Sequence, residues 1–256
     1  MQEYFLTWFM VFVRAGAMLA IFPIFSAAAM PVRLRIAMAG FLAMLTLPGV
    51  ALPEGFFQSD LAQFIGIILK EVMYGLLLGF VCRLILFTVA LAGHYIGGEL
   101  GLQLGSLIAP GESTPSSTPS VMLQMMTVML MFSLDIHFEL LMGFQQSYNV
   151  LAIGTGGLSN ELFDQVTLLC ARTFTVALRI AAPLIAVSIV VNLLMMVLGR
   201  TIPEVNVFIM KFSVSILVGV FLFGFTLSLA AREITNYLKQ LPHDFAVITH
   251  LLAGGG

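Results

Sequence analysis

Residues 70–105 of the chain read KEVMYGLLLGFVCRLILFTVALAGHYIGGELGLQLG, a long apolar run in which glycines recur every fourth residue. On an α-helix, residues four apart lie on one face, so these glycines form stripes of bare backbone. Each glycine destabilises a helix interior, but small residues also let neighbouring helices in a membrane approach closely. No Gly-Lys-Ser/Thr sequence follows, which argues against a phosphate-binding loop. The pattern therefore predicts long, closely packed helices with Gly75, Gly79, Gly93, Gly97, Gly101 and Gly105 at the contacts.

The composition of the whole chain agrees with an apolar environment. Of 256 residues, 11 are Lys or Arg and 13 are Asp or Glu, together 9%, whereas a soluble domain carries about 25% charged residues. Hydrophobic residues make up 60% and the mean hydropathy is +1.05, more than a soluble protein of this length could bury. A net charge of −2 without a basic block offers nothing to a phosphate backbone. These values exclude an ordinary cytosolic enzyme, a disordered chain and a protein that binds nucleic acid.

Apolar windows of about 20 residues predict membrane spans, and single charges are tolerated inside a helix bundle. Merging windows across lone charges gives about six helices, at residues 5–30, 36–52, 64–95, 120–152, 166–199 and 206–231. The third, fourth and fifth are too long for one simple crossing, so we expect them to be kinked, tilted or partly outside the bilayer. The predicted fold class is all-α, a polytopic helical membrane protein. Because Glu3 stands where a signal peptide is basic, we expect the first segment to be retained.

The connecting segments set the expected domain limits. Turn residues lie at 52–55, 154–157 and 201–204, and a polar proline-rich stretch at 109–120 needs protein or water around it. We expect one helical domain over residues 1–235 and a C-terminal tail over 236–256. The tail ends in three glycines, and the sequence leaves open whether they derive from an expression vector. Arginines at 33, 35 and 200 favour a cytoplasmic side for their loops, whereas Arg232 and Lys239 argue against that orientation.

Charged residues inside the apolar stretches are expensive in lipid, so each should face protein or water. The sequence leaves two interpretations open, an interhelical pair or a polar pathway such as a proton relay. These residues are Arg14, Glu71, Arg83, Glu99, Asp135, Glu139, Arg172, Arg179 and Lys211. Asp135 and Glu139 would share a helical face from which His137 is turned away, so a metal site is disfavoured. The chain contains none of the common catalytic motifs, and we predict no enzyme activity, no cofactor and no metal.

Three groups of residues, in order along the chain, resemble the FliR family. The first is Lys70-Glu71 followed by Gly75 and Gly79, and the second is Ala92-Gly93 and Ile96-Gly97 leading through Gly101 to Pro110. The third is Pro183, Asn192-Leu193, Gly199-Arg200, Pro203, Asn206 and Phe208. The resemblance covers roughly residues 5–235. FliR proteins are the R-type subunits of the bacterial flagellar type III export gate, with relatives in virulence injectisomes, and the motifs look more flagellar.

The resemblance implies helices arranged as hairpins within a hetero-oligomeric gate in the inner (cytoplasmic) membrane, at the flagellar basal body. Its partners would be P-type and Q-type gate subunits, the B-type switch subunit, unfolded flagellar export substrates and the lipid bilayer. The segment at about 104–120 would form a plug, with Leu104, Ser106, Leu107, Ile108, Ala109 and Pro110 at the gate. Leucines stand at 104 and 107 where the family often has phenylalanine. Buried charges or subunit contacts are expected at Lys70, Glu71, Arg83, Arg200 and Glu204.

Two other functions remain open from the sequence. One is a secondary transporter of a small solute, using Arg83, Asp135 and Arg179 along its path. Such a transporter should show two related halves with interrupted helices, and no convincing internal repeat is visible. The other is a non-conducting membrane scaffold that only orders its partners. An intramembrane enzyme is disfavoured because no catalytic constellation is present.

Overall fold

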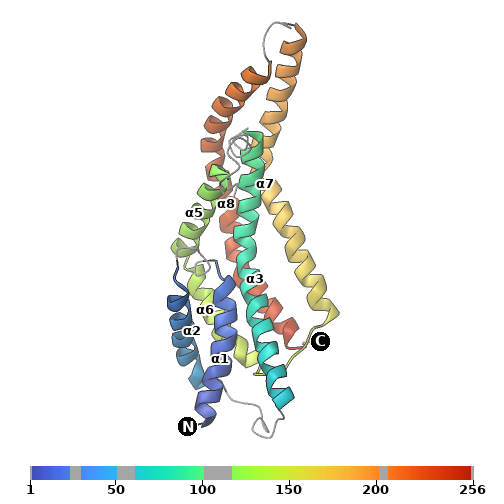
Figure 1. Ribbon diagram of the computed structural model, residues 1–256. Coiled ribbons are helices and arrows are strands. Elements are labelled where there is room, and N and C mark those ends of the chain that lie inside the picture. Colours follow the sequence, from blue (N-terminus) through green and yellow to red (C-terminus); the bar gives the residue numbers. More distant parts are fainter. Residues whose placement is uncertain (1, 24–29, 51–60, 101–116, 202–206, 255–256) are drawn as a thin grey trace. The chain divides into compact units, whose positions relative to one another are not determined.

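The computed structural model describes residues 2–23, 30–50, 61–100, 117–201 and 207–254 (Figure 1). Every regular element in these ranges is helical. They are α1 (Gln2–Ile21), α2 (Val32–Thr46), the short 3-10 helix η1 (Leu47–Gly49), α3 (Leu61–Glu99), α5 (Thr118–Ser133), α6 (Ile136–Val150), α7 (Asn160–Thr201) and α8 (Val207–Leu252). The predicted all-α fold class is confirmed.

Five stretches of the described helices are long and apolar enough to cross a membrane. They are Glu3–Ile21, Val32–Gly49, Leu61–Glu99, Asn160–Thr201 and Ser213–Leu252, and a sixth results if α5 and α6 together form one span. These spans confirm a polytopic helical membrane protein, and their order matches the six predicted helices. The first predicted helix extended to residue 30, whereas α1 ends at Ile21.

The fourth predicted helix, 120–152, is interrupted between α5 and α6. Asp135 stands at the start of α6 with a φ of 56°, a left-handed conformation that costs a non-glycine residue roughly 1–2 kcal/mol. Glycine and proline are the usual sequence signals of a break, and neither occurs at Leu134-Asp135. The length of the segment predicted a kink, tilt or extension beyond the bilayer, but the local sequence did not indicate a break at Asp135.

Helix α8 (Val207–Leu252) includes most of the residues predicted as a C-terminal tail, 236–256. It extends to Leu252 and contains Pro242 in its interior. Its buried residues recur at helical spacing, three or four positions apart. They are Tyr237, Leu238, Leu241, Phe245, Ile248 and Leu252. Burial of this stripe explains why the helix persists across a proline that removes one backbone hydrogen bond.

The chain divides into two compact units. Unit 1 comprises Met1–Leu84, Leu134–Cys170 and Leu238–Gly256, and unit 2 comprises Ile85–Ser133 and Ala171–Tyr237. Helices α3, α7 and α8 each contribute one part to each unit. The single domain expected over residues 1–235 stays a prediction.

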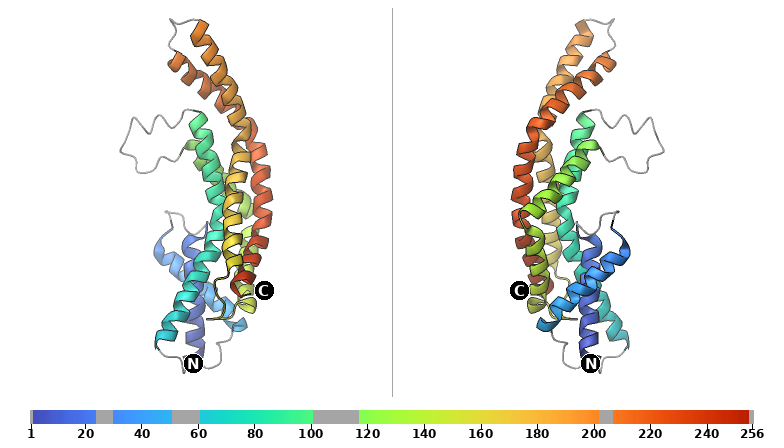
Figure 2. Two further views of the ribbon diagram at one scale, coloured as in Figure 1. Left: turned by 90° about the vertical axis from the view of Figure 1, so that its right-hand side faces the viewer. Right: turned by 90° about the vertical axis from the view of Figure 1, so that its left-hand side faces the viewer.

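In unit 1, α1 and α2 form a hairpin, visible in both views of Figure 2, and α3 packs closely on α1. The indole Nε1 of Trp8 donates a hydrogen bond to the carbonyl oxygen of Gly40 at 3.3 Å. A Cβ atom on Gly75 would overlap the carbonyl oxygen of Arg14, and one on Gly79 would lie 2.7 Å from that of Met18. Both glycines therefore lie where the backbone of α1 leaves no room for a side chain.

In unit 2, the start of α5 packs on the last turns of α3. The Ser117 hydroxyl donates to the carbonyl oxygen of Gly93 at 2.9 Å, and the Ser120 hydroxyl to that of Ala90 at 3.2 Å. A Cβ on Gly93 would overlap the backbone of Ser120, and one on Gly97 would lie 2.5 Å from the Cβ of Ser117. The other two glycines of the stripe, Gly101 and Gly105, lie outside the described residues.

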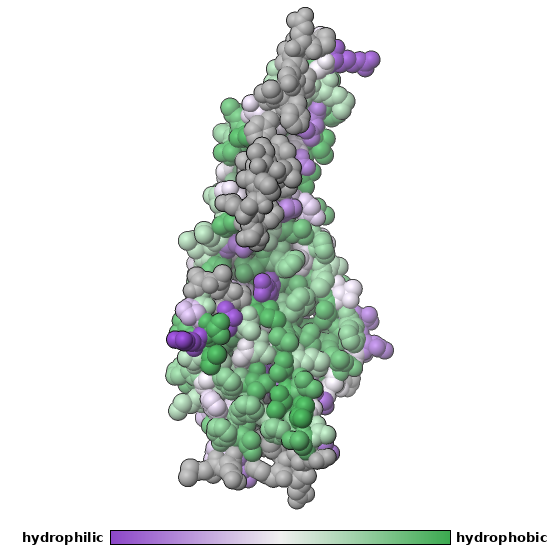
Figure 3. All heavy atoms as spheres, in the orientation of Figure 1, coloured by the Kyte–Doolittle hydropathy of each residue, from purple (hydrophilic) through white to green (hydrophobic). Residues whose placement is uncertain are grey.

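Apolar side chains cover much of the surface seen in Figure 3. On α1 and α2 the exposed ones include Tyr4, Phe5, Phe41, Met44 and Leu45. A soluble monomer rarely exposes so large an apolar surface. This surface is suited to lipid or to apolar partner helices.

Replacing Gly75 by alanine is expected to destabilise the protein by about 1–3 kcal/mol, because the added methyl group must push α3 away from α1. The matched control is Gly66→Ala on the same helix, where a Cβ meets nothing within 4 Å. That change should be neutral or stabilising, by up to about 1 kcal/mol, since alanine is the better helix former. Thermal unfolding of the purified protein in mild detergent measures both variants, and equal midpoints would contradict the close packing.

Candidate functional site

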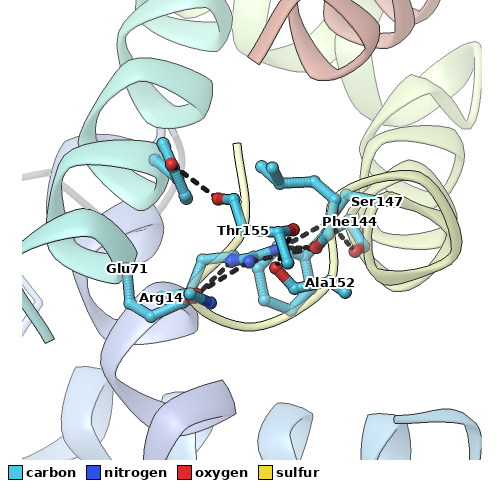
Figure 4. A network of polar contacts seen from close by, with 9 residues as sticks. Arg14, Glu71, Phe144, Ser147, Ala152 and Thr155 are labelled. Atoms are coloured by element: carbon cyan, nitrogen blue, oxygen red, sulfur yellow. Dashed lines mark hydrogen bonds and ion pairs between the residues drawn. The ribbon is translucent and has the colours of Figure 1, made fainter. Parts of the chain in front are cut away.

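A buried ion pair joins α1 to α3 in unit 1. Arg14 and Glu71 have no exposed side-chain surface. The guanidinium Nε donates to Oε2 of Glu71 at 2.6 Å, and Nη2 donates to Oε1 at 3.0 Å. This is the two-pronged geometry in which arginine binds a carboxylate most strongly. Figure 4 shows the two side chains pointing toward each other.

The remaining donors of Arg14 reach the end of α6. Nη1 and Nη2 each donate to the carbonyl oxygen of Leu151 at 3.2 Å, and Nη1 also lies 3.4 Å from the Ser147 hydroxyl. With the two bonds to Glu71, these five contacts match the five N–H donors of a guanidinium. The centre of the guanidinium lies 4.0 Å from the centroid of the Tyr148 ring, within the range of a cation–π interaction. Arg14 thus holds α6 as well as α3.

The turn after α6 closes the other side of the network. The backbone N–H of Gly154 donates to Oε1 of Glu71 at 3.0 Å. Lys70 Nζ donates to the carbonyl oxygens of Gly154 and Gly156 at 3.2 and 3.3 Å, and the Tyr74 hydroxyl donates to that of Thr155 at 2.8 Å. One turn of α3 therefore binds this loop through three side chains.

Two glycines shape that turn and bring it to the end of α8. Gly154 and Gly156 have φ values of 72° and 81°, which glycine adopts at little steric cost. A Cβ on Gly156 would overlap the carbonyl oxygen of Leu252, and that oxygen accepts a hydrogen bond from Gly157 N–H at 3.1 Å. The network, named here the Arg14–Glu71 clamp, links α1, α3, α6, residues 151–157 and the end of α8.

The chemistry of the clamp is structural. A buried charge is tolerated when it is paired and its hydrogen-bonding groups are satisfied, as they are here. Of the two interpretations left open by the sequence, Arg14 and Glu71 form the interhelical pair. Because all five guanidinium N–H donors of Arg14 contact Glu71, Leu151 or Ser147, none remains for a passing solute.

The other charged residues singled out from the sequence lie in different surroundings. Arg83 on α3 and Arg200 in the last turn of α7 are exposed. Glu99 accepts a hydrogen bond from the Ser188 hydroxyl, and the Arg172 guanidinium lies 5.0 Å from the Tyr237 ring, both within unit 2. Asp135, Glu139, Arg179 and Lys211 are exposed. Glu204 and the expected plug residues Leu104, Ser106, Leu107, Ile108, Ala109 and Pro110 lie outside the described residues.

Sequence reasoning missed the partner of Arg14 and the whole contribution of residues 151–157. A usable signal was present, because Arg14 and Glu71 are opposite charges in two strongly apolar segments. The turn was noted only as a helix break at 154–157, and nothing local shows that its backbone would contact α3.

Comparison with known proteins supports the resemblance seen in the sequence. Residues 5–241 match the family of bacterial export proteins, family 1. The chain belongs to this family. The flagellar biosynthetic protein FliR of Caulobacter vibrioides is 27% identical to the chain over 92% of the chain and 94% of its own length. The FliR proteins of Escherichia coli and Bacillus subtilis are each 24% identical, over 96% and 84% of the chain and 98% and 84% of their own lengths. The recognition of a FliR family protein is confirmed.

Removing either member of the ion pair is expected to destabilise this family member strongly. Glu71→Leu or Arg14→Met leaves an unpaired buried charge, which costs about 3–5 kcal/mol. The double variant Arg14→Met with Glu71→Leu should be clearly more stable than the sum of the single changes predicts, because neither charge remains. Thermal unfolding in detergent provides the double-mutant cycle.

The control for this cycle is Arg83→Gln, an exposed residue on the same helix as Glu71, which should change stability by less than about 0.5 kcal/mol. Additive effects of the two single replacements would show that Arg14 and Glu71 do not depend on each other.

Proposed function

We propose that this chain is the R-type subunit of a flagellar type III export gate. The observation that carries the proposal is the family match over residues 5–241, together with FliR relatives that align along nearly their whole length. Membership in this family indicates a component of the flagellar export apparatus located in a membrane. The finer proposal is that the chain forms, with P-type and Q-type subunits, a gated channel for unfolded flagellar proteins across the cytoplasmic membrane, and that it also contacts the B-type switch subunit.

The surface of unit 2 supports a role as one subunit of an assembly. Leu217, Phe221 and Phe225 of α8 lie four residues apart on one face and are 73%, 79% and 73% exposed. Lipid or an apolar partner helix could cover this stripe. Arg179 on α7 is also exposed, and a cation in the middle of an apolar helix is costly in lipid. A protein or aqueous neighbour on α7 therefore fits better than lipid alone.

The role proposed for the subunit in export is passive rather than enzymatic. The Arg14–Glu71 clamp gives unit 1 a cross-linked frame of helices, and the energy for transport would come from partner proteins. Unfolded substrates differ in sequence, so a seal of Leu, Ile and Met side chains would suit them better than specific hydrogen-bond donors.

The family resemblance supports a plug at Leu104, Ser106, Leu107, Ile108, Ala109 and Pro110. Deleting Ser106–Pro110 should make cells that carry the assembled gate leak ions and small solutes, because the apolar seal is removed. Membrane permeability to a small dye, measured beside the wild type, tests this expectation. Co-purification of the partner subunits is the control for assembly, and an intact complex with unchanged permeability would count against the plug.

Purification in mild detergent with the neighbouring export proteins co-expressed separates the proposed functions. A stable hetero-oligomer is expected if the chain is a gate subunit. A monodisperse monomer that binds a small solute would instead support the transporter.

A chromosomal deletion of the gene for this chain is a cellular test. The deletion is expected to abolish secretion of flagellar protein, and the wild-type chain is expected to restore it. Normal secretion in the deletion strain would contradict a role in export.

A conducting gate and a non-conducting scaffold are expected to give different results in the permeability experiment on the Ser106–Pro110 deletion.

Exchange of Gly97 for leucine is expected to prevent recovery of the intact complex, because Ser117 leaves no room for the larger side chain. The matched change Gly66→Leu introduces the same side chain on α3 where nothing lies within 4 Å of the Cβ. Equal recovery of the complex from both variants would contradict a packing role for Gly97.

A further inference from the structure

An exposed strip of side chains follows one face of α3 in unit 1. Along the helix its positions alternate between intervals of four and three residues, and they are Leu69, Met73, Leu76, Phe80 and Arg83. Four of them are exposed and Met73 is half-buried, whereas every other residue from Glu71 to Leu84 is buried or half-buried. Alternating intervals of three and four residues are the spacing at which one helix packs against a single partner helix. We call these five residues the α3 strip.

Arg83 places a positive charge in this otherwise apolar strip. Within the part of the chain that the structure describes, its guanidinium has no ion-pair partner. Glu71, an acidic residue of the same helix, is already paired with Arg14. Arg83 lies in the interior of α3, which extends from Leu61 to Glu99. A cation in the interior of an apolar helix is costly in lipid, so a negative charge on a neighbouring molecule would stabilise it.

The apolar residues on both sides of Arg83 argue against lipid as that neighbour. No Lys, Arg, Asp or Glu occurs at positions 72–82 before it or at positions 84–98 after it. Phe80 and Phe87, about one turn to either side, are 37% and 64% exposed. If Arg83 lay at headgroup depth to meet a phosphate, the apolar surface on one side of it would face water. If it lay deeper, no lipid group could neutralise it.

Two other neighbours also fit less well than a different protein. In a symmetric pair of identical chains the same surface meets itself, and the α3 strip contains no carboxylate to face Arg83. A water-filled channel would solvate the guanidinium but would leave Leu69 and Leu76, which are 63% and 39% exposed, in water. An apolar helix that carries one carboxylate accommodates both the charge and the apolar side chains.

We infer that the α3 strip packs against one helix of a neighbouring subunit, in which an Asp or Glu side chain pairs with Arg83. The apolar positions supply the contact area, and the ion pair fixes the register of the two helices. The inference rests on the proposed function, because it requires a neighbouring membrane protein, and it adds the chemistry by which that protein is recognised. The small effect expected for Arg83→Gln on the stability of the isolated chain agrees with it, since the partner is then absent.

Charge substitutions at Arg83 test the ion pair in the complex purified with co-expressed export proteins. Arg83→Glu should lower recovery of the complex at least about tenfold, because like charges then meet at the contact. Arg83→Lys keeps the charge and should preserve far more of the recovery. The matched control Gln63→Glu introduces the same negative charge at the exposed start of α3, outside the strip, and should leave recovery unchanged. Wild-type recovery with Arg83→Glu would overturn the inference.

A photoactivatable phenylalanine analogue in place of Phe80 identifies the neighbour without any change of charge. The cells are illuminated before purification, and the adduct is analysed by mass spectrometry. We expect an adduct with an export protein, on an apolar helix that carries Asp or Glu within about one turn of the cross-linked residue, because Phe80 and Arg83 lie on one face of α3. An adduct with phospholipid, with a second copy of the chain or with a helix that lacks such an acid would overturn the inference.

A charge exchange completes the test and separates it from that of the proposed function. Replacing the identified acid by lysine in the Arg83→Glu background should restore recovery of the complex, and failure to restore it would count against the ion pair. If deletion of the gene abolishes secretion while the analogue at position 80 labels phospholipid, the chain is an export component and only the docking inference fails. Normal secretion in the deletion strain would contradict the export role itself, whichever molecule the analogue labels.

Discussion

Unit 1 depends on the buried pair formed by the Arg14 guanidinium and the Glu71 carboxylate. Two charges withdrawn from water are stable only when they are close together and fully hydrogen-bonded. This requirement fixes α1 against α3, and the donors left over fix the end of α6 through Leu151. The carboxylate in turn accepts from Gly154 N–H and so positions residues 151–157. One electrostatic constraint thus determines the mutual placement of three segments that are distant in sequence, namely α1, α3 and the end of α6 with the following residues 151–157.

The glycines of α3 make that short ion pair geometrically possible. Glu71, Gly75 and Gly79 follow one another at intervals of four, so they share one face of the helix. The carbonyl oxygen of Arg14 lies where a Cβ on Gly75 would stand. Close backbone contact and the ion pair are therefore two aspects of one interface, in which small residues let the helices approach and the charges fix their register. This explains why the motif combines Lys70-Glu71 with glycines four and eight residues after Glu71.

The Arg14–Glu71 clamp and the exposed apolar side chains are both consistent with membership in a family of export proteins. In the proposed gate, a subunit would need a defined frame while neighbouring subunits handle unfolded chains. The clamp supplies such a frame in unit 1, and the exposed stripe on α8 in unit 2 provides surface for neighbours.

Three groups of motif residues, in order along the chain, indicated which family it resembles. Composition and periodicity alone determined that the chain is all-α, that it belongs in a membrane and where its apolar segments lie. These properties depend on local repeats, which a linear sequence displays directly. Only the tertiary structure decided which residue neutralises Arg14, that Asp135 interrupts the fourth predicted helix and that α8 continues to Leu252. Arg14 lies 57 residues from Glu71 and 137 from Leu151. Such pairings are chosen by the burial of charge in three dimensions, which leaves no periodic trace along the chain.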